Sequence, residues 1–174
     1  ETRIEIVDSY SVAMALGFQV LQTARAIEQG ADMVECIELA EKAKEHTGVV
    51  FAVDTLEFLH RGGRIGGGAR FLGTLLNTKP ILELQDGRIE AVERIRTRKK
   101  SITRLLELTE ERVGSKQPFR LSVLHANAPD EANELMEKAK ERFDLTESIF
   151  SEVSPVVGTH AGPGTIGIAY MAGM

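Results

Sequence analysis

Short apolar runs and segments of helical periodicity follow one another along the chain, and this pattern predicts an α/β fold. Residues 49–53 are wholly apolar and predict a strand buried on both faces. Before them, apolar positions recur at helical spacing over residues 12–28, and Asp32 with Glu35 matches a capping box that opens a second helix. With a short strand predicted at residues 4–7, this order indicates an α/β unit with a parallel sheet.

The pattern changes after residue 80. Residues 81–84 and 88–92 alternate around Asp86-Gly87, which is a strong hairpin signal and predicts antiparallel strands. Further elements are predicted at residues 99–113 (helix), 119–125 (strand), 129–143 (helix), 146–153 (strand) and 166–171 (strand). We therefore predict two units: residues 1–53, the remainder of an N-terminal α/β domain with a parallel sheet, and residues 54–174, an α/β domain with a largely antiparallel sheet.

A first glycine segment, which we define as residues 61–64, follows the buried strand. Asp54 and Glu57 have capping-box spacing, so a short helix is expected to begin at once and to stop at Gly62-Gly63. Arg61 and Arg64 flank the glycines, and their guanidinium groups match phosphate or carboxylate geometry. An anion site and simple capping of the helix C-terminus both remain open.

A second glycine segment, residues 158–164, surrounds a single histidine. Gly158, Gly162, Pro163 and Gly164 predict an unusual loop that holds His160 rigidly. An imidazole in such a position suits anion contact or proton transfer near neutral pH. The alternative is a tight turn between strands in which the histidine has no role.

Arginines alternate with other residues at positions 94, 96 and 98. If the preceding strand extends that far, its period places Arg94, Arg96 and Arg98 on one face, where they would attract an anionic ligand or partner. The alternative is a solvated face that guards a sheet edge.

Composition excludes several classes of function. The net charge of −5 over 174 residues gives no sign of nucleic-acid binding. The single cysteine, Cys36, fits a reducing compartment such as the cytoplasm. The four histidines have no metal-ligand spacing, and there is no phosphate-binding P-loop motif, so we expect no metal and no other cofactor. No apolar run approaches the roughly 20 residues of a membrane span.

Taken in order, these motifs resemble the DegV family, whose best-understood members are fatty-acid-binding subunits of bacterial fatty acid kinase. The resemblance is carried by residues 54–65, 76–81, Asp86-Gly87, 96–98, His125 and 158–164, and covers nearly the whole chain. It implies that a long-chain fatty acid lies between two α/β domains, with its tail in an apolar tunnel and its carboxylate held by hydroxyls. A separate kinase subunit, which binds ATP itself, then phosphorylates the carboxylate to an acyl phosphate.

The resemblance also implies roles for individual residues. Arg61 and Arg64, with Arg96 or Arg98, would form a cationic rim that meets the kinase or the phosphate, and His160 would lie beside the transferred group. The glycines that shape this site are Gly62, Gly63, Gly162 and Gly164. The tunnel wall would include Phe58, Phe71, Leu72 and Leu75, for which core packing is the alternative role. The family's carboxylate-binding Thr and Ser would precede Glu1, so we expect a missing N-terminal segment.

Three hypotheses follow for function. The first is a non-catalytic lipid carrier that serves a kinase subunit, with peripheral membrane contact left open. The second is a transferase in which Arg64 and His160 act directly on an anionic substrate, and the third is an interaction domain without lipid. The first hypothesis requires the two glycine segments to converge on one opening above an apolar cavity.

Overall fold

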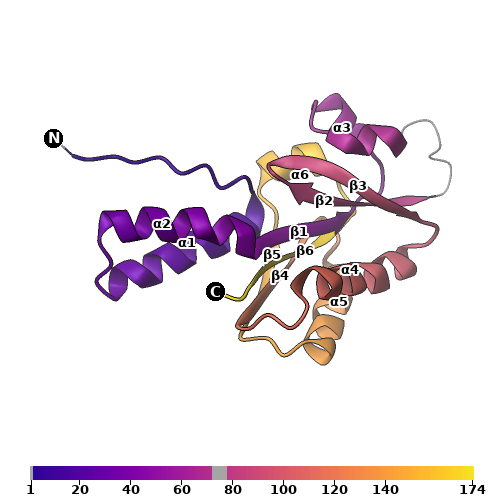
Figure 1. The fold of residues 1–174 in the computed structure, drawn as a ribbon. Helices are drawn as coiled ribbons and strands as arrows, with labels where there is room; N and C mark the ends of the chain where they lie inside the picture. The colour runs from indigo at the N-terminus through magenta and orange to yellow at the C-terminus, as the bar shows by residue number, and fades with distance from the viewer. Residues whose placement is uncertain (1, 72–77) are drawn as a thin grey trace.

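The described part of the chain folds around a six-stranded sheet with the order β3-β2-β1-β6-β4-β5 (Figure 1). The computed structural model describes residues 2–71 and 78–174. Within these residues β4 and β5 are parallel, and the other neighbouring strands are antiparallel. The strands are β1 (Thr47–Ala52), β2 (Lys79–Gln85), β3 (Arg88–Ile95), β4 (Phe119–Ala126), β5 (Glu147–Glu152) and β6 (Thr165–Ala172). The predicted α/β class with a largely antiparallel sheet is confirmed.

Helices cover both faces of this sheet. The α-helices are α1 (Ala13–Glu28), α2 (Met33–Ala43), α3 (Glu57–Arg61), α4 (Arg98–Val113), α5 (Pro129–Arg142) and α6 (Pro155–Ala161). Two 3₁₀ helices, η1 (Lys44–His46) and η2 (Gly66–Phe71), are also described. In Figure 1, α1 and α2 form a helical hairpin to one side of the sheet, whereas α3 and α6 lie near each other at the opposite end of β1.

Strand β1 lies in the middle of the sheet, where it pairs with β2 on one side and β6 on the other. Val50 and Ala52 are 1% and 0% exposed, which confirms the predicted buried strand. However, β1 runs antiparallel to both β2 and β6, so the parallel sheet predicted around it is wrong. The predicted strand at residues 4–7 is also wrong: this segment has no strand pairing, and Ile6 is 92% exposed. The predicted division of the chain at residue 53 stays a prediction, although β1 shares its sheet with later strands.

Alternate residues of β1 belong to different hydrophobic clusters. Val50 and Ala52 pack with the buried faces of α4 and α5. Val49 and Phe51 point to the other face, where they meet residues of α1 and α3. This alternation follows from the two-residue period of a strand. The two faces of β1 therefore contribute to two separate hydrophobic clusters.

Several local signals produce the predicted elements. Asp32 and Glu35 form a reciprocal capping box at the start of α2, with Glu35 N donating to Asp32 Oδ1 (3.0 Å). Asp86 and Gly87 both have positive φ in the β2–β3 hairpin, which confirms that turn. The capping box predicted for Asp54 is wrong: α3 begins two residues later than expected, and the Asp54 carboxylate accepts from Lys79 Nζ (2.9 Å) instead.

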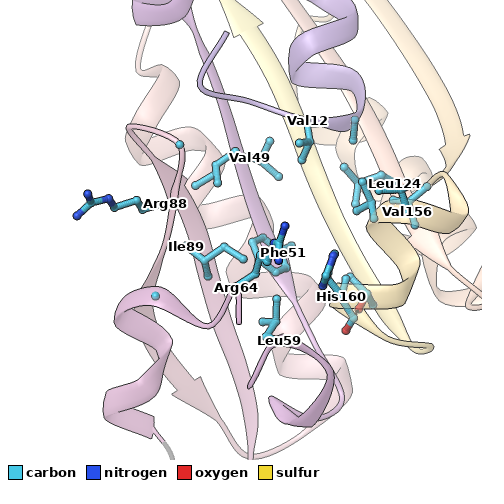
Figure 2. Close-up of a pocket in the computed structure, with 18 of the residues that line it drawn as sticks. Val12, Val49, Phe51, Leu59, Arg64, Arg88, Ile89, Leu124, Val156 and His160 are labelled. Carbon is cyan, nitrogen blue, oxygen red and sulfur yellow. Dashed lines mark hydrogen bonds between the residues drawn. The ribbon is translucent and has the colours of Figure 1, made fainter. Parts of the chain in front are cut away.

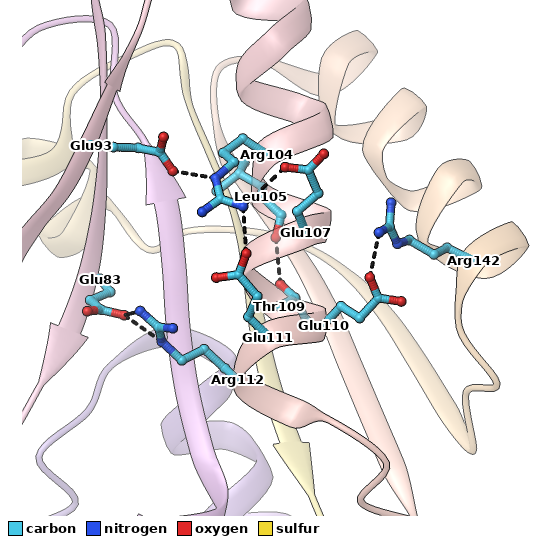
Figure 3. Close-up of polar contacts among 10 residues, drawn as sticks. All are labelled: Glu83, Glu93, Arg104, Leu105, Glu107, Thr109, Glu110, Glu111, Arg112 and Arg142. Atoms are coloured by element: carbon cyan, nitrogen blue, oxygen red, sulfur yellow. Dashed lines mark hydrogen bonds and ion pairs between the residues drawn. The ribbon is translucent and has the colours of Figure 1, made fainter.

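An ion-pair network fixes α4 against the sheet (Figure 3). Arg104 contacts Glu93 of β3, and also Glu107 (3.1 Å) and Glu111 (2.7 Å) of its own helix. The hydrogen bonds that Arg104 donates to Glu111 and Glu93 raise the pKa of Arg104, and its bond to Glu111 lowers the pKa of that carboxyl group. Because Glu93 lies on β3, this network holds the helix in place along the edge of the sheet.

Candidate functional site

A cavity of about 500 Å³ opens on the face of the sheet opposite α4 and α5 (Figure 2). Its volume lies within the range of about 300–1,000 Å³ that small-molecule sites occupy. The lining is largely apolar and includes Val12, Val49, Phe51, Leu59, Leu84, Ile89, Leu124, Val153, Val156 and Val157. His160 and Arg64 contribute polar groups to the same lining. The site therefore combines an apolar interior with an imidazole and a guanidinium.

The two glycine segments meet beside this cavity. A Cβ atom on Gly62 would lie 2.1 Å from His160 Nδ1. In the opposite direction, a Cβ atom on Gly162 would lie 2.3 Å from the ring of Phe58. These approaches are possible only because both positions lack side chains. Segments that are about a hundred residues apart in the sequence thus share one opening, as the carrier hypothesis requires.

His160 lies in the last turn of α6, not in the loop predicted for residues 158–164. The helix begins because Ser154 Oγ accepts from Val157 N (3.4 Å) and Pro155 occupies the first helical turn. Its last turn is closed by Thr165, whose hydroxyl donates to the carbonyl of Gly162 (2.8 Å). The pair Ser154-Pro155 is a sequence signal for the start of a helix, but the glycines that follow favoured a loop prediction.

The imidazole of His160 is half-buried and lines the cavity. Its Nδ1 atom is buried and has no hydrogen-bond partner among the described residues. Arg64 is exposed at the same opening, where Nη1 donates to the Gly62 carbonyl (2.9 Å). Figure 2 shows both side chains among the residues that line the cavity. The structure therefore brings these two predicted residues together.

The other predicted arginines have different surroundings. Arg61 is exposed, pairs with Glu57 of its own helix (2.6 Å) and does not line the cavity. Arg96 is exposed in the turn between β3 and α4. Arg98 is partly buried at the start of α4, where it contacts Glu131. Because β3 ends at Ile95, the single-faced arginine row that a longer strand would give does not form.

The predicted tunnel wall is only partly described. Phe58 packs against the Gly162 backbone and is not part of the cavity lining. Leu72 and Leu75 lie outside the described residues, as does the side chain of Phe71. Sequence reasoning missed Val49 and Phe51 as lining residues, although their alternation with Val50 along a strand is the signal that places them on one face.

Residues 2–71 and 78–174 contain neither a metal-ligand cluster nor a helix suited to span a membrane. No group of three or more His, Cys, Asp or Glu side chains in this part of the chain could hold a metal ion. Nor does any helix described there have the length and apolarity that a membrane span needs.

The chain belongs to the DegV family. The family model "Uncharacterised protein, DegV family" matches residues 1–173. A DegV domain-containing protein of Streptomyces coelicolor is 42% identical over 166 residues, which are 95% of this chain and 59% of that protein. Protein DegV of Bacillus subtilis is 38% identical over 94% of this chain and 58% of its own length. The chain thus spans less than two thirds of the relatives that it matches.

Solved structures share the fold. A protein of Thermus thermophilus, described as "Fatty Acid Binding of a DegV family Protein", matches with a TM-score of 0.93 and 33% identity, over 98% of this chain and 61% of that one. DegV of Bacillus subtilis, described as "a fatty acid binding protein", matches with a TM-score of 0.83 and 36% identity, over 95% of this chain and 59% of that one.

Proposed function

We propose that the protein binds a long-chain fatty acid, with the acyl tail in the cavity and the carboxylate at the opening beside His160 and Arg64. The observation that carries this proposal is the apolar cavity of about 500 Å³ with both side chains in its lining. The printed descriptions of the Thermus thermophilus and Bacillus subtilis relatives, which name fatty acid binding, support it.

The physical chemistry of the site fits such a ligand. Each buried methylene contributes about 0.8 kcal/mol, so a long alkyl chain supplies most of the binding free energy. Valine, leucine and phenylalanine side chains line the cavity and offer the tail no polar competitor. At the opening, a guanidinium and an imidazole are suited to an anionic group. The acid would be oriented by its two ends.

We further propose that the protein acts as a non-catalytic carrier in the cytoplasm, and that a separate ATP-binding kinase subunit phosphorylates the bound carboxylate to an acyl phosphate. Negative charge grows at the reacting group during phosphoryl transfer. We assign Arg64 and His160, which line the cavity, and the exposed Arg96 to that charge and to the kinase contact.

Native mass spectrometry of the full-length protein, purified from bacteria, tests this function. The expected result is a complex whose excess mass equals a long-chain fatty acid and is lost on delipidation. The delipidated protein should then take up palmitate but not a short acid such as acetate. If the purified protein carries no lipid, does not bind palmitate and hydrolyses ATP without a partner, the result would contradict the carrier hypothesis and support the transferase hypothesis.

A further inference from the structure

We propose that Arg98 and Asp54 form a clamp that holds the two glycine segments in their relative position, and that Arg98 is a positioning residue for the mouth of the cavity. Asp54 lies between β1 and α3, and α3 leads from it to the first glycine segment. Gly164 closes the second segment, just before β6. The consequence for lipid binding rests on the proposed function, whereas the clamp itself rests on the contacts of Arg98.

Arg98 reaches three separate parts of the chain with one guanidinium. Nη2 donates to the carbonyl of Gly164, and Nε donates to Glu131 Oε1 at the start of α5 (3.2 Å). Nη1 lies 3.6 Å from Asp54 Oδ1, which is close enough for an ion pair but too long for a hydrogen bond. The Arg98 side chain is only 18% exposed. A planar fork with several donors is the group that can bridge such partners simultaneously.

Asp54 also contacts the second glycine segment directly. A Cβ atom on Gly164 would lie 2.4 Å from Asp54 Oδ2, so the carboxylate packs against bare backbone. Gly164 N donates to the Ala126 carbonyl (2.8 Å), and its φ of +81° favours glycine. Gly164 is therefore held by two sets of contacts. Its N–H donates to β4 on one side, and Arg98 and Asp54 contact it on the other side.

Short elements transmit this position to the mouth of the cavity. The five residues of α3 connect the Asp54 region to Gly62, and the seven residues of α6 place His160 shortly before Gly164. Gly62 and His160 are in turn packed against each other. The clamp joins the chain just before α3 to the chain just after α6, and the Gly62–His160 contact joins the end of α3 to the last turn of α6. The positions of Arg64 and His160 in the cavity lining therefore depend on both contacts.

Two further charged groups, Lys79 and Glu131, lie beside the clamp, so two positive and two negative side chains meet there. Arg98 and Lys79 face the carboxylates of Asp54 and Glu131. Because the Arg98 side chain is only 18% exposed, the loss of a carboxylate partner leaves a largely buried guanidinium with less compensation.

The test compares Arg98→Met with Arg112→Met. Arg112 pairs with Glu83 near the other end of α4, roughly 20 Å along the helix, and is the matched control. The readout is the NMR signal of the His160 imidazole in lipid-free protein, assigned with His160→Asn. His46, which contacts the Ala172 carbonyl (2.8 Å), is an internal reference.

In Arg98→Met we expect the His160 signals to shift or broaden while the His46 signals stay in place, and palmitate affinity to fall by about tenfold. Arg112→Met should leave both unchanged. Unaltered His160 signals in folded Arg98→Met would overturn the clamp. If the wild-type protein binds no palmitate, the proposed function fails, but the comparison of His160 signals still decides the clamp.

Two conservative variants cover the case in which Arg98→Met does not fold. Arg98→Lys keeps the charge but loses the fork, so we expect the His160 signals to change as in Arg98→Met. Asp54→Asn keeps the size and removes the charge, and should shift the same signals. Wild-type His160 signals in both variants would contradict a clamp that depends on these two groups.

Discussion

The imidazole of His160 occupies the space that a side chain at position 62 would need, since a Cβ atom on Gly62 would lie 2.1 Å from Nδ1. The φ of Gly62 is −78°, so alanine fits the backbone and the conflict is purely steric. We therefore expect Gly62→Ala to displace His160. The measurement is the change in the His160 NMR signals relative to wild type.

Gly63→Ala is the matched control for that variant. Gly63 has a φ of +67° and nothing within 4 Å of a built Cβ, so the cost is backbone strain of about 1 kcal/mol without a clash. We expect a lower free energy of unfolding in denaturant with His160 signals close to wild type. If the two variants moved His160 equally, direct packing of Gly62 on the imidazole would not be the cause.

A second prediction concerns the exposed apolar wall of the cavity. Val156 is 73% exposed, so Val156→Asp should fold normally, but it places a carboxylate beside the acyl tail and the anionic head. We expect palmitate affinity to fall by about tenfold or more. Val34→Asp, at a 51% exposed valine of α2 outside the lining, should leave affinity unchanged. Equal affinity in both variants would place the lipid elsewhere.

His160 should matter for the transferred group more than for the tail. His160→Ala is expected to retain palmitate binding, because the apolar lining supplies most of the free energy. The same variant should lose phosphorylation of the bound acid by the kinase subunit. Titration calorimetry and a coupled phosphorylation assay measure the two effects. Loss of palmitate binding with the fold intact would contradict the role assigned to His160.

Stability at high pH depends on Tyr170. Burial raises the pKa of this phenol from 10.0 to about 12, so the folded protein holds its proton more tightly than the unfolded chain does. The free energy of unfolding should therefore fall as the pH rises from about 10 to 12, by about 2 kcal/mol. Tyr170→Phe should remove that part of the decline. Denaturation at a series of pH values measures it, and an identical decline in both proteins would contradict the assignment.

Local signals in the sequence predicted most elements because their causes are local. The capping box of Asp32 and Glu35 and the turn at Asp86-Gly87 each involve neighbouring residues only, and both form as expected. Asp54 has the same spacing to Glu57, but its carboxylate pairs with Lys79 and Arg98. Both partners are distant in the sequence, so no local pattern predicts these contacts. The tertiary contact therefore decided against the predicted cap.

The sequence pointed to residues that the structure places in one cavity lining, but their roles stay predictions and the geometry around them could not be predicted. The glycine motifs and the resemblance single out His160, Arg64 and the four glycines, and both His160 and Arg64 line the cavity. The sequence alone could not predict which of the arginines lines the cavity and which one contacts other segments of the chain. Because β3 ends at Ile95, Arg96 and Arg98 do not continue the strand face of Arg94. The guanidinium of Arg98 instead donates to the carbonyl of Gly164.

The orientation of bound palmitate tests the central claim most directly. Isotope-labelled palmitate, added to delipidated protein, allows nuclear Overhauser contacts to be assigned separately to the methylene beside the carboxylate and to the rest of the chain. We predict contacts from that methylene to the His160 ring, and from the chain to Val49 and Phe51. Contacts confined to exposed side chains outside the lining, such as Val34, with none to His160 or Phe51, would contradict the account.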